Sequence, residues 1–149
     1  WGIIEKTGGA LKPIDFGTIN FPAKTAQSEK LAAIEKNIAD LIAKHRPEIM
    51  AIEKIFFFKN AKTVIAVAEA RGVILLAAAK AGLAVSEHAP LQIKQAVSAY
   101  GRAGNAQIQN MVKLILNLKE APRQDDAADA LACAICCANS LRSRLTTRD

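Results

Sequence analysis

Residues 48–53 read EIMAIE, a short apolar run that ends on a glutamate. A run of this length between two longer helical patterns is typical of a buried strand in an α/β protein. Before it, residues 28–45 place apolar side chains every three or four positions, and the pattern ends just ahead of Pro47. After it, residues 60–81 are apolar on most sides, and Gly82 stands where a helix commonly ends in a left-handed glycine. We therefore expect a strand between two helices, with Glu53 at the carboxyl end of the strand.

The rest of the chain extends this alternation in both directions. Residues 1–6 and 11–21 read as extended segments around a Thr-Gly-Gly turn, which is a hairpin signal. Further along we expect a strand at 83–88 and helices at 90–98, 105–118 and 125–141. The chain begins with two strands and continues with alternating helices and strands, and this order predicts a mixed sheet with helices on its faces. We expect a single domain over residues 1–141 and a basic tail over residues 142–149.

Composition excludes several classes of protein. The chain has 149 residues, of which 51% are hydrophobic and 23% charged, as expected for one globular domain. Its 20 Lys and Arg against 14 Asp and Glu give a net charge of +6, which favours a polyanionic partner. No uninterrupted apolar stretch reaches the ~18 residues of a membrane span, and the first residues do not resemble a signal peptide.

The three cysteines crowd into one predicted helix, at Cys133, Cys136 and Cys137. An odd number of cysteines on one short segment is no disulfide framework, so we expect a protein of the reducing cytoplasm. Neither His45 nor His88 has ligand spacing to these cysteines, so we interpret the thiols as small buried residues rather than zinc ligands.

Acidic residues form the most informative pattern. Asp126 and Asp129 stand three positions apart, so on a helix they share a face. Locally, Asp125 or Asp126 is also suited to cap the helix, with the remaining acids simply solvated. Glu53 is harder to explain in this way, because a carboxylate at the end of a core strand is costly unless it is paired or binds a metal. Several convergent carboxylates are what Mg²⁺ and two-metal phosphodiester cleavage require.

The motifs around these acids follow one another in the order and spacing of a known family. They are AIEKIFF at 51–57, EARGV at 69–73, PLQIKQAV at 90–97 and DDAADALA at 125–132. Together they resemble the RuvC family of bacterial Holliday-junction resolvases over the chain up to about residue 140. The resemblance implies a ribonuclease H-like α/β fold, with a mixed five-stranded sheet flanked by helices. It also implies a homodimer that resolves four-way DNA junctions by paired symmetric nicks in recombination and repair.

The resemblance assigns roles to individual residues. Glu53, Asp126 and Asp129 match three of the four family acids, which bind divalent metal for catalysis. Lys94 matches a lysine near the catalytic centre, where it holds the scissile phosphate or offsets transition-state charge. Phe56 matches an aromatic residue that contacts junction bases. Further candidates for the DNA surface are Lys54, Lys59, Arg102 and Asn105, with Asn105 standing where the family often has a second lysine and Arg102 offering a replacement charge.

The fourth family acid lies in a Gly-Ile-Asp-Pro-Gly motif on the first strand, which the resemblance places before Trp1. We expect that residues preceding Trp1 belong to the native protein. The implied cofactor is Mg²⁺, with Mn²⁺ able to substitute and two ions per active site. The implied partners are junction DNA, a second copy of the chain and the branch-migration complex of RuvA and RuvB.

Two alternatives to a junction-resolving enzyme stay open. A chain with an incomplete metal site would bind four-way junctions without cutting them. A ribonuclease H-like nuclease with another substrate, such as an RNA–DNA hybrid, would share the same acids. Loss of cutting with retained binding on replacing Asp126 or Glu53 would separate the enzyme from the binding protein.

Overall fold

The computed structural model describes residues 1–55, 61–98 and 103–146, and its order of elements is ββαβαβααα. The chain forms two compact units, each described here on its own. One unit comprises residues 1–18, 51–54 and 87–149, and the other comprises residues 19–50 and 55–86. The prediction of one domain over residues 1–141 stays a prediction.

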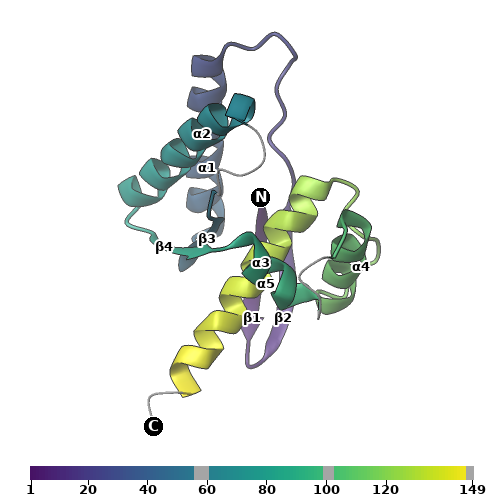
Figure 1. Ribbon diagram of the computed structural model, residues 1–149. Helices are drawn as coiled ribbons and strands as arrows, with labels where there is room; N and C mark the ends of the chain where they lie inside the picture. Colours follow the sequence, from purple (N-terminus) through teal and green to yellow (C-terminus); the bar gives the residue numbers. More distant parts are fainter. Residues whose placement is uncertain (56–60, 99–102, 147–149) are drawn as a thin grey trace. The chain divides into compact units, whose positions relative to one another are not determined.

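The second unit is built from two long helices that lie side by side, α1 (Gln27–His45) and α2 (Ala61–Lys80) (Figure 1). Two polar contacts tie them together: Gln27 Nε2 donates to Glu69 Oε2 at 2.8 Å, and Lys80 Nζ pairs with Glu35 Oε1 at 2.8 Å. Helix α2 ends as the sequence predicts, because Gly82 takes a left-handed φ of 65° just beyond it.

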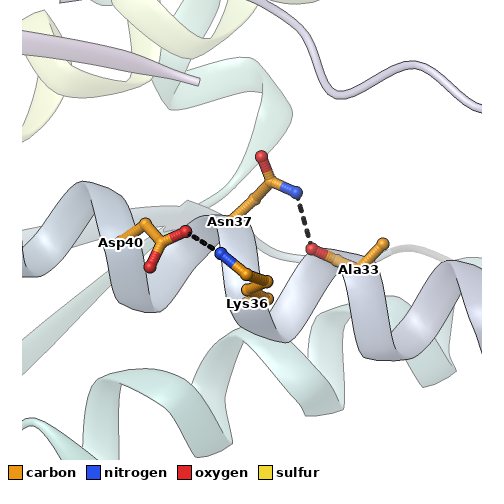
Figure 2. Close-up of polar contacts among 4 residues, drawn as sticks. All are labelled: Ala33, Lys36, Asn37 and Asp40. Atoms are coloured by element: carbon orange, nitrogen blue, oxygen red, sulfur yellow. Dashed lines mark hydrogen bonds and ion pairs between the residues drawn. The ribbon is translucent and has the colours of Figure 1, made fainter.

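The solvent face of α1 carries polar contacts within the helix. Lys36 pairs with Asp40 one turn later, and Asn37 Nδ2 donates to the Ala33 carbonyl oxygen at 2.7 Å (Figure 2). The Lys36 and Asp40 side chains keep 75% and 66% of their exposure, so solvent screens their attraction. The pKa of Lys36 is nonetheless raised by its hydrogen bond to Asp40 and by that carboxylate's charge. The pair adds little to stability, and packing against α2 is what holds α1.

The first unit begins with the predicted hairpin. Strand β1 (Gly2–Thr7) pairs antiparallel with β2 (Ala10–Phe16), in a register that joins Gly2 to Phe16 and Thr7 to Ala10. The turn uses a left-handed Gly8, with a φ of 67°. Strand β2 alternates exposed and half-buried residues, so one of its faces meets solvent.

Helix α5 (Asp125–Thr146) packs against this hairpin and against helices α3 (Pro90–Val97) and α4 (Asn105–Ile115) (Figure 1). Strand β1 and α5 approach closely at Gly2, where an added Cβ would lie 2.7 Å from Leu131 Cδ2. Lys6 Nζ also donates a hydrogen bond to the Ala138 carbonyl oxygen of α5. The core of the unit consists of buried apolar side chains from these three helices, chiefly Ile93, Val97, Ile108, Val112, Leu116, Leu131 and Ile135.

Strand β3 (Ile49–Glu53) pairs with β4 (Ala84–His88), which confirms that EIMAIE forms a strand. The prediction that this strand is buried is wrong, because residues 49–52 are only half-buried and Glu53 is exposed. Among the described residues the four strands form two separate pairs, β1–β2 and β3–β4, rather than one joined sheet. The expected five-stranded sheet included a first strand placed before Trp1. The described residues contain four strands, and the chain is α/β as predicted.

All three cysteines are free and buried in α5, which confirms the prediction from their spacing. Within the described part of the chain, no helix is both long and apolar enough to cross a membrane.

Candidate functional site

Glu53 ends β3 inside the first unit. The next residue fixes the end of the strand, because the Lys54 N–H donates to the His88 carbonyl oxygen at 2.9 Å. Beyond His88 the chain enters α3, whose first turn is closed by Pro90 and by a 2.8 Å bond from the Ala89 N–H to Gln92 Oε1. This turn leads to Lys94, so the end of the β3–β4 pair and the start of α3 bring Glu53 and Lys94 together.

Helix α5 contributes the second group of acids. Its first hydrogen bond runs from the Ala128 N–H to the Gln124 carbonyl oxygen at 3.2 Å, so Gln124 caps the helix and Asp125 is its first helical residue. Asp126 and Asp129 follow within the first turn and a half. The prediction that Asp125 or Asp126 serves as the N-cap is therefore wrong by one or two positions, because the hydrogen-bonded turn starts earlier.

The pKa shifts show that these groups act on one another. Partial burial and the charge of Asp129 raise the pKa of Glu53, and the nearby Lys94 ammonium opposes that rise. Burial, followed by the charges of Asp125 and Asp126, raises the pKa of Asp129, and Lys94 again opposes. Asp129 thus interacts with the charges of Glu53, Asp126 and Lys94, and Glu53 also interacts with Lys94. The role of these residues in metal binding and catalysis stays a prediction.

Carboxylates that raise one another's pKa form a negative site that a cation would relieve, and oxygen donors are those that hard divalent ions prefer. The donor set therefore fits a divalent metal. Within residues 1–55, 61–98 and 103–146, however, no three His, Cys, Asp or Glu side chains stand close enough to one another to hold an ion. The residues present supply the chemistry of a metal site without a converged set of three ligands.

Asp125 makes the best-defined polar contact near these acids. Its Oδ2 accepts a hydrogen bond from Asn105 Nδ2, and its Oδ1 accepts one from Gln109 Nε2, both at 2.8 Å. Sequence reasoning missed this arrangement, since it considered Asp125 as a cap and Asn105 as a DNA contact. The signal available was an amide pair at i and i+4 on the predicted helix 105–118.

The other predicted DNA contacts are only partly visible. Lys54 is exposed at the end of β3, and Asn105 is exposed at the start of α4, where its amide is bound to Asp125. Phe56, Lys59 and Arg102 lie outside the described residues. In the basic tail, residues 147–149 also lie outside the described part.

The histidine–cysteine relationship differs from the one predicted from spacing. His88 is buried, and its Nδ1 lies 3.5 Å from Cys136 Sγ although 48 positions separate the two residues. Burial raises the pKa of Cys136, and it raises that of Cys133 to about 12. These thiols are therefore protonated at neutral pH, which agrees with their prediction as packing residues.

Comparison with known proteins finds related sequences and related structures. A sequence model of the family described as "Crossover junction endodeoxyribonuclease RuvC" matches residues 1–137. The chain belongs to the RuvC family. The RuvC of Halothermothrix orenii is 51% identical over 95% of this chain and 86% of that protein, and the RuvC of Heliobacterium modesticaldum is 50% identical over 95% and 87%. Both relatives carry the name crossover junction endodeoxyribonuclease, and the family is one of metal-dependent nucleases.

Solved RuvC structures share the fold. The Thermus thermophilus RuvC structure superposes with a TM-score of 0.83 at 31% identity, covering 95% of this chain and 86% of that one. The structure of T. thermophilus RuvC in complex with a Holliday junction substrate gives a TM-score of 0.84 at 29% identity, covering 95% and 87%. These neighbours confirm the predicted ribonuclease H-like fold class.

The raised pKa values of Glu53 and Asp129 predict that the folded protein without metal is less stable when these carboxyls are ionised. A carboxyl whose pKa is raised on folding destabilises the ionised folded state, so stability falls as pH rises through the shifted pKa. We expect Glu53→Gln to stabilise the protein in EDTA at pH 7.5, by under about 1 kcal/mol because solvent screens an exposed group. The gain should shrink as pH falls from the raised pKa of Glu53 toward its ordinary value of 4.5. Urea unfolding from pH 4 to pH 8 measures it, and a gain independent of pH would contradict this cause.

Proposed function

We propose that the protein is a divalent-metal-dependent endonuclease that resolves four-way DNA junctions by paired nicks. The observation that carries the proposal is the grouping of Glu53, Asp129 and Lys94 in one unit of a RuvC-family chain. Its support includes the likeness to a RuvC structure solved with a Holliday junction substrate. Such a protein works in DNA recombination and repair in the cytoplasm, which agrees with its three free cysteines.

In this mechanism Glu53, Asp126 and Asp129 hold the metal. We propose Mg²⁺ as the ion, with Mn²⁺ able to substitute and two ions per active site. When bound, the metal supplies charge neutralisation at the phosphate and lowers the pKa of the attacking water. The protein's own contribution is to fix the acids: Glu53 is held by the β3–β4 pairing at its strand end, and Asp126 and Asp129 by the first turns of α5. Rigid supports of this kind keep the ligands in place before the substrate arrives.

Lys94 holds the scissile phosphate next to these acids. In the free protein the Lys94 ammonium offsets the negative charges of Glu53 and Asp129. With substrate bound, the same ammonium would stabilise the negative charge that develops on the phosphate. We expect Lys94→Met to lower the cleavage rate constant about 100-fold. Junction affinity should change only slightly, because many phosphate contacts share it. Single-turnover cleavage and gel shift measure the two effects, with Lys119→Met, a change at an exposed lysine beyond α4, as the matched control. Equal losses in affinity and rate would contradict this role.

The DNA surface includes Lys54, and the sequence adds Phe56, Lys59 and Arg102. Basic residues bind the phosphates of the arms, and an aromatic ring suits an unpaired base at the crossover. Affinity for the junction should therefore fall steeply as salt rises. We propose that the enzyme works together with the branch-migration complex of RuvA and RuvB.

Paired nicks need two active sites, so we propose a homodimer. Helix α2 offers the surface: Ile65 is 68% exposed and Leu76 54%. These two apolar side chains lie on one face of the helix, because the positions between them make about three full turns. We expect Ile65→Glu combined with Leu76→Glu to convert the dimer to a monomer that makes unpaired nicks. Light scattering measures the mass, and Leu91→Glu on α3, an equally exposed leucine, is the control. A monomeric wild type, or an unchanged mass in the variant, would exclude this interface.

Binding without cutting is the second candidate, and it is favoured by the lack of three converged ligands among the described residues. Substrate competition tests the proposed function. A labelled four-way junction is incubated with protein and Mg²⁺, with unlabelled junction, linear duplex or RNA–DNA hybrid as competitor. The proposal predicts cuts at symmetric positions that only unlabelled junction suppresses efficiently. Suppression by the hybrid would favour a ribonuclease H-like nuclease of another specificity, and binding without cuts would favour the second candidate.

A further inference from the structure

The carboxylate of Asp125 is gripped by two amides from another helix. Asn105 Nδ2 and Gln109 Nε2 each donate to a different oxygen of that carboxylate, both at 2.8 Å. Asn105 is the first residue of α4 and Gln109 lies one turn later, so both amides lie on one face of the helix. A carboxylate held by two donors from a single helix face has little freedom to turn, because both of its oxygens are engaged.

The two hydrogen bonds to Asp125 lie at the start of α5, next to the candidate metal-binding acids. Asp125 is the first residue of α5, directly before Asp126 and one turn before Asp129. The residue ahead of it is also held, since Thr18 Oγ1 donates to Gln124 Oε1 at 2.9 Å. The buried contacts of α5 begin only at Ala127, so without such polar ties its first turn would tend to fray.

We propose that Asn105 and Gln109 are positioning residues, which hold Asp125 so that the first turn of α5 presents Asp126 and Asp129 to the metal in a fixed orientation. The inference rests on the proposed function, because it concerns the same acids. It also assigns Asn105 a role other than DNA contact. Outer-shell partners that orient metal ligands commonly change metal affinity 10- to 100-fold, and the exposure of this pair places it near the lower end.

The hydrogen bond between Asn105 and Asp125 can be tested by exchanging the amide and the carboxylate between the two positions. Asn105→Asp sets two carboxylates against each other and breaks the contact. Adding Asp125→Asn restores it, because the new amide can donate to position 105 while its oxygen still accepts from Gln109. The double variant keeps the net charge of the wild type. Asn110→Asp, the same change at an exposed position of the same helix, is the matched control.

Two readouts need no cleavage. The first is amide hydrogen exchange of residues 128–131 in EDTA, where Asn105→Asp should speed exchange about tenfold, as expected for a locally loosened helix end. The second is Mn²⁺ binding followed by electron paramagnetic resonance, where Asn105→Asp should weaken binding about tenfold. The sign is diagnostic, because an added negative charge alone would strengthen cation binding. The double variant should return to within about threefold of wild type in both.

The outcomes separate this proposal from the proposed function. If wild type binds Mn²⁺ and cuts junctions but Asn105→Asp changes neither readout, or the double variant is no better than Asn105→Asp, the positioning role is wrong and the enzyme stands. If Asn105→Asp weakens junction binding in EDTA and Asp125→Asn does not rescue it, Asn105 contacts DNA instead. If wild type neither cuts nor binds Mn²⁺, the proposed function fails, and positioning of metal ligands fails with it. If the double variant regains both the wild-type exchange rate and the wild-type Mn²⁺ affinity, the positioning role is supported.

Discussion

Replacing Asp126 by asparagine is expected to abolish junction cleavage and leave junction binding intact. The change removes one negative charge and one strong metal ligand but keeps the shape of the side chain. Loss of a ligand that stabilises transition-state charge by several kcal/mol corresponds to a rate loss on the order of 1,000-fold. Cleavage of a labelled four-way junction in Mg²⁺, together with a gel shift in Ca²⁺ or EDTA, measures both properties. Asp129→Asn and Glu53→Gln are expected to behave in the same way.

Asp40→Asn on α1 is the matched control, because it makes the same chemical change at an exposed carboxylate of the other unit. It should cut and bind like the wild type. Retention of more than about a tenth of the wild-type rate in Asp126→Asn would show that Asp126 is not a metal ligand. Loss of binding in parallel with cleavage would instead indicate a damaged fold.

Truncating Leu131 to alanine should destabilise the protein more than any surface change. The side chain is fully buried in α5 and lies against Gly2 of β1, so its removal leaves a cavity between helix and hairpin. Leucine-to-alanine changes at such sites cost about 2–5 kcal/mol. Urea unfolding measures the loss, with Leu114→Ala at a 70% exposed position as the control that should change stability little. A cost under about 1 kcal/mol would contradict the packing of α5 on β1.

Local sequence patterns predicted the elements well because their boundaries are set by nearby residues. Pro47 and Gly82 mark the ends of α1 and α2, and the left-handed Gly82 occurs where the apolar pattern stops. The EIMAIE run became β3 with Glu53 at its end. These features need only the chemistry of a few consecutive residues.

The contacts that organise the site were not predictable in this way. Asn105 and Asp125 are 20 positions apart, and His88 and Cys136 are 48 apart. Such pairs depend on how α4 and the end of β4 lie against α5, and a single sequence holds no local trace of that packing. The roles of Glu53 and Lys94 came from the family resemblance, since a strand-end acid and a helix lysine have many ordinary explanations.

The account's central claim is that these acids make the chain a metal-dependent junction nuclease. The most direct test is a nicking assay on a synthetic four-way junction, with Mg²⁺ in one arm and EDTA in the other and binding scored by gel shift in the same samples. The account predicts symmetric paired cuts in Mg²⁺, no cuts in EDTA, and a shifted complex in both arms. Junction binding without any cuts in Mg²⁺ or Mn²⁺ would contradict it.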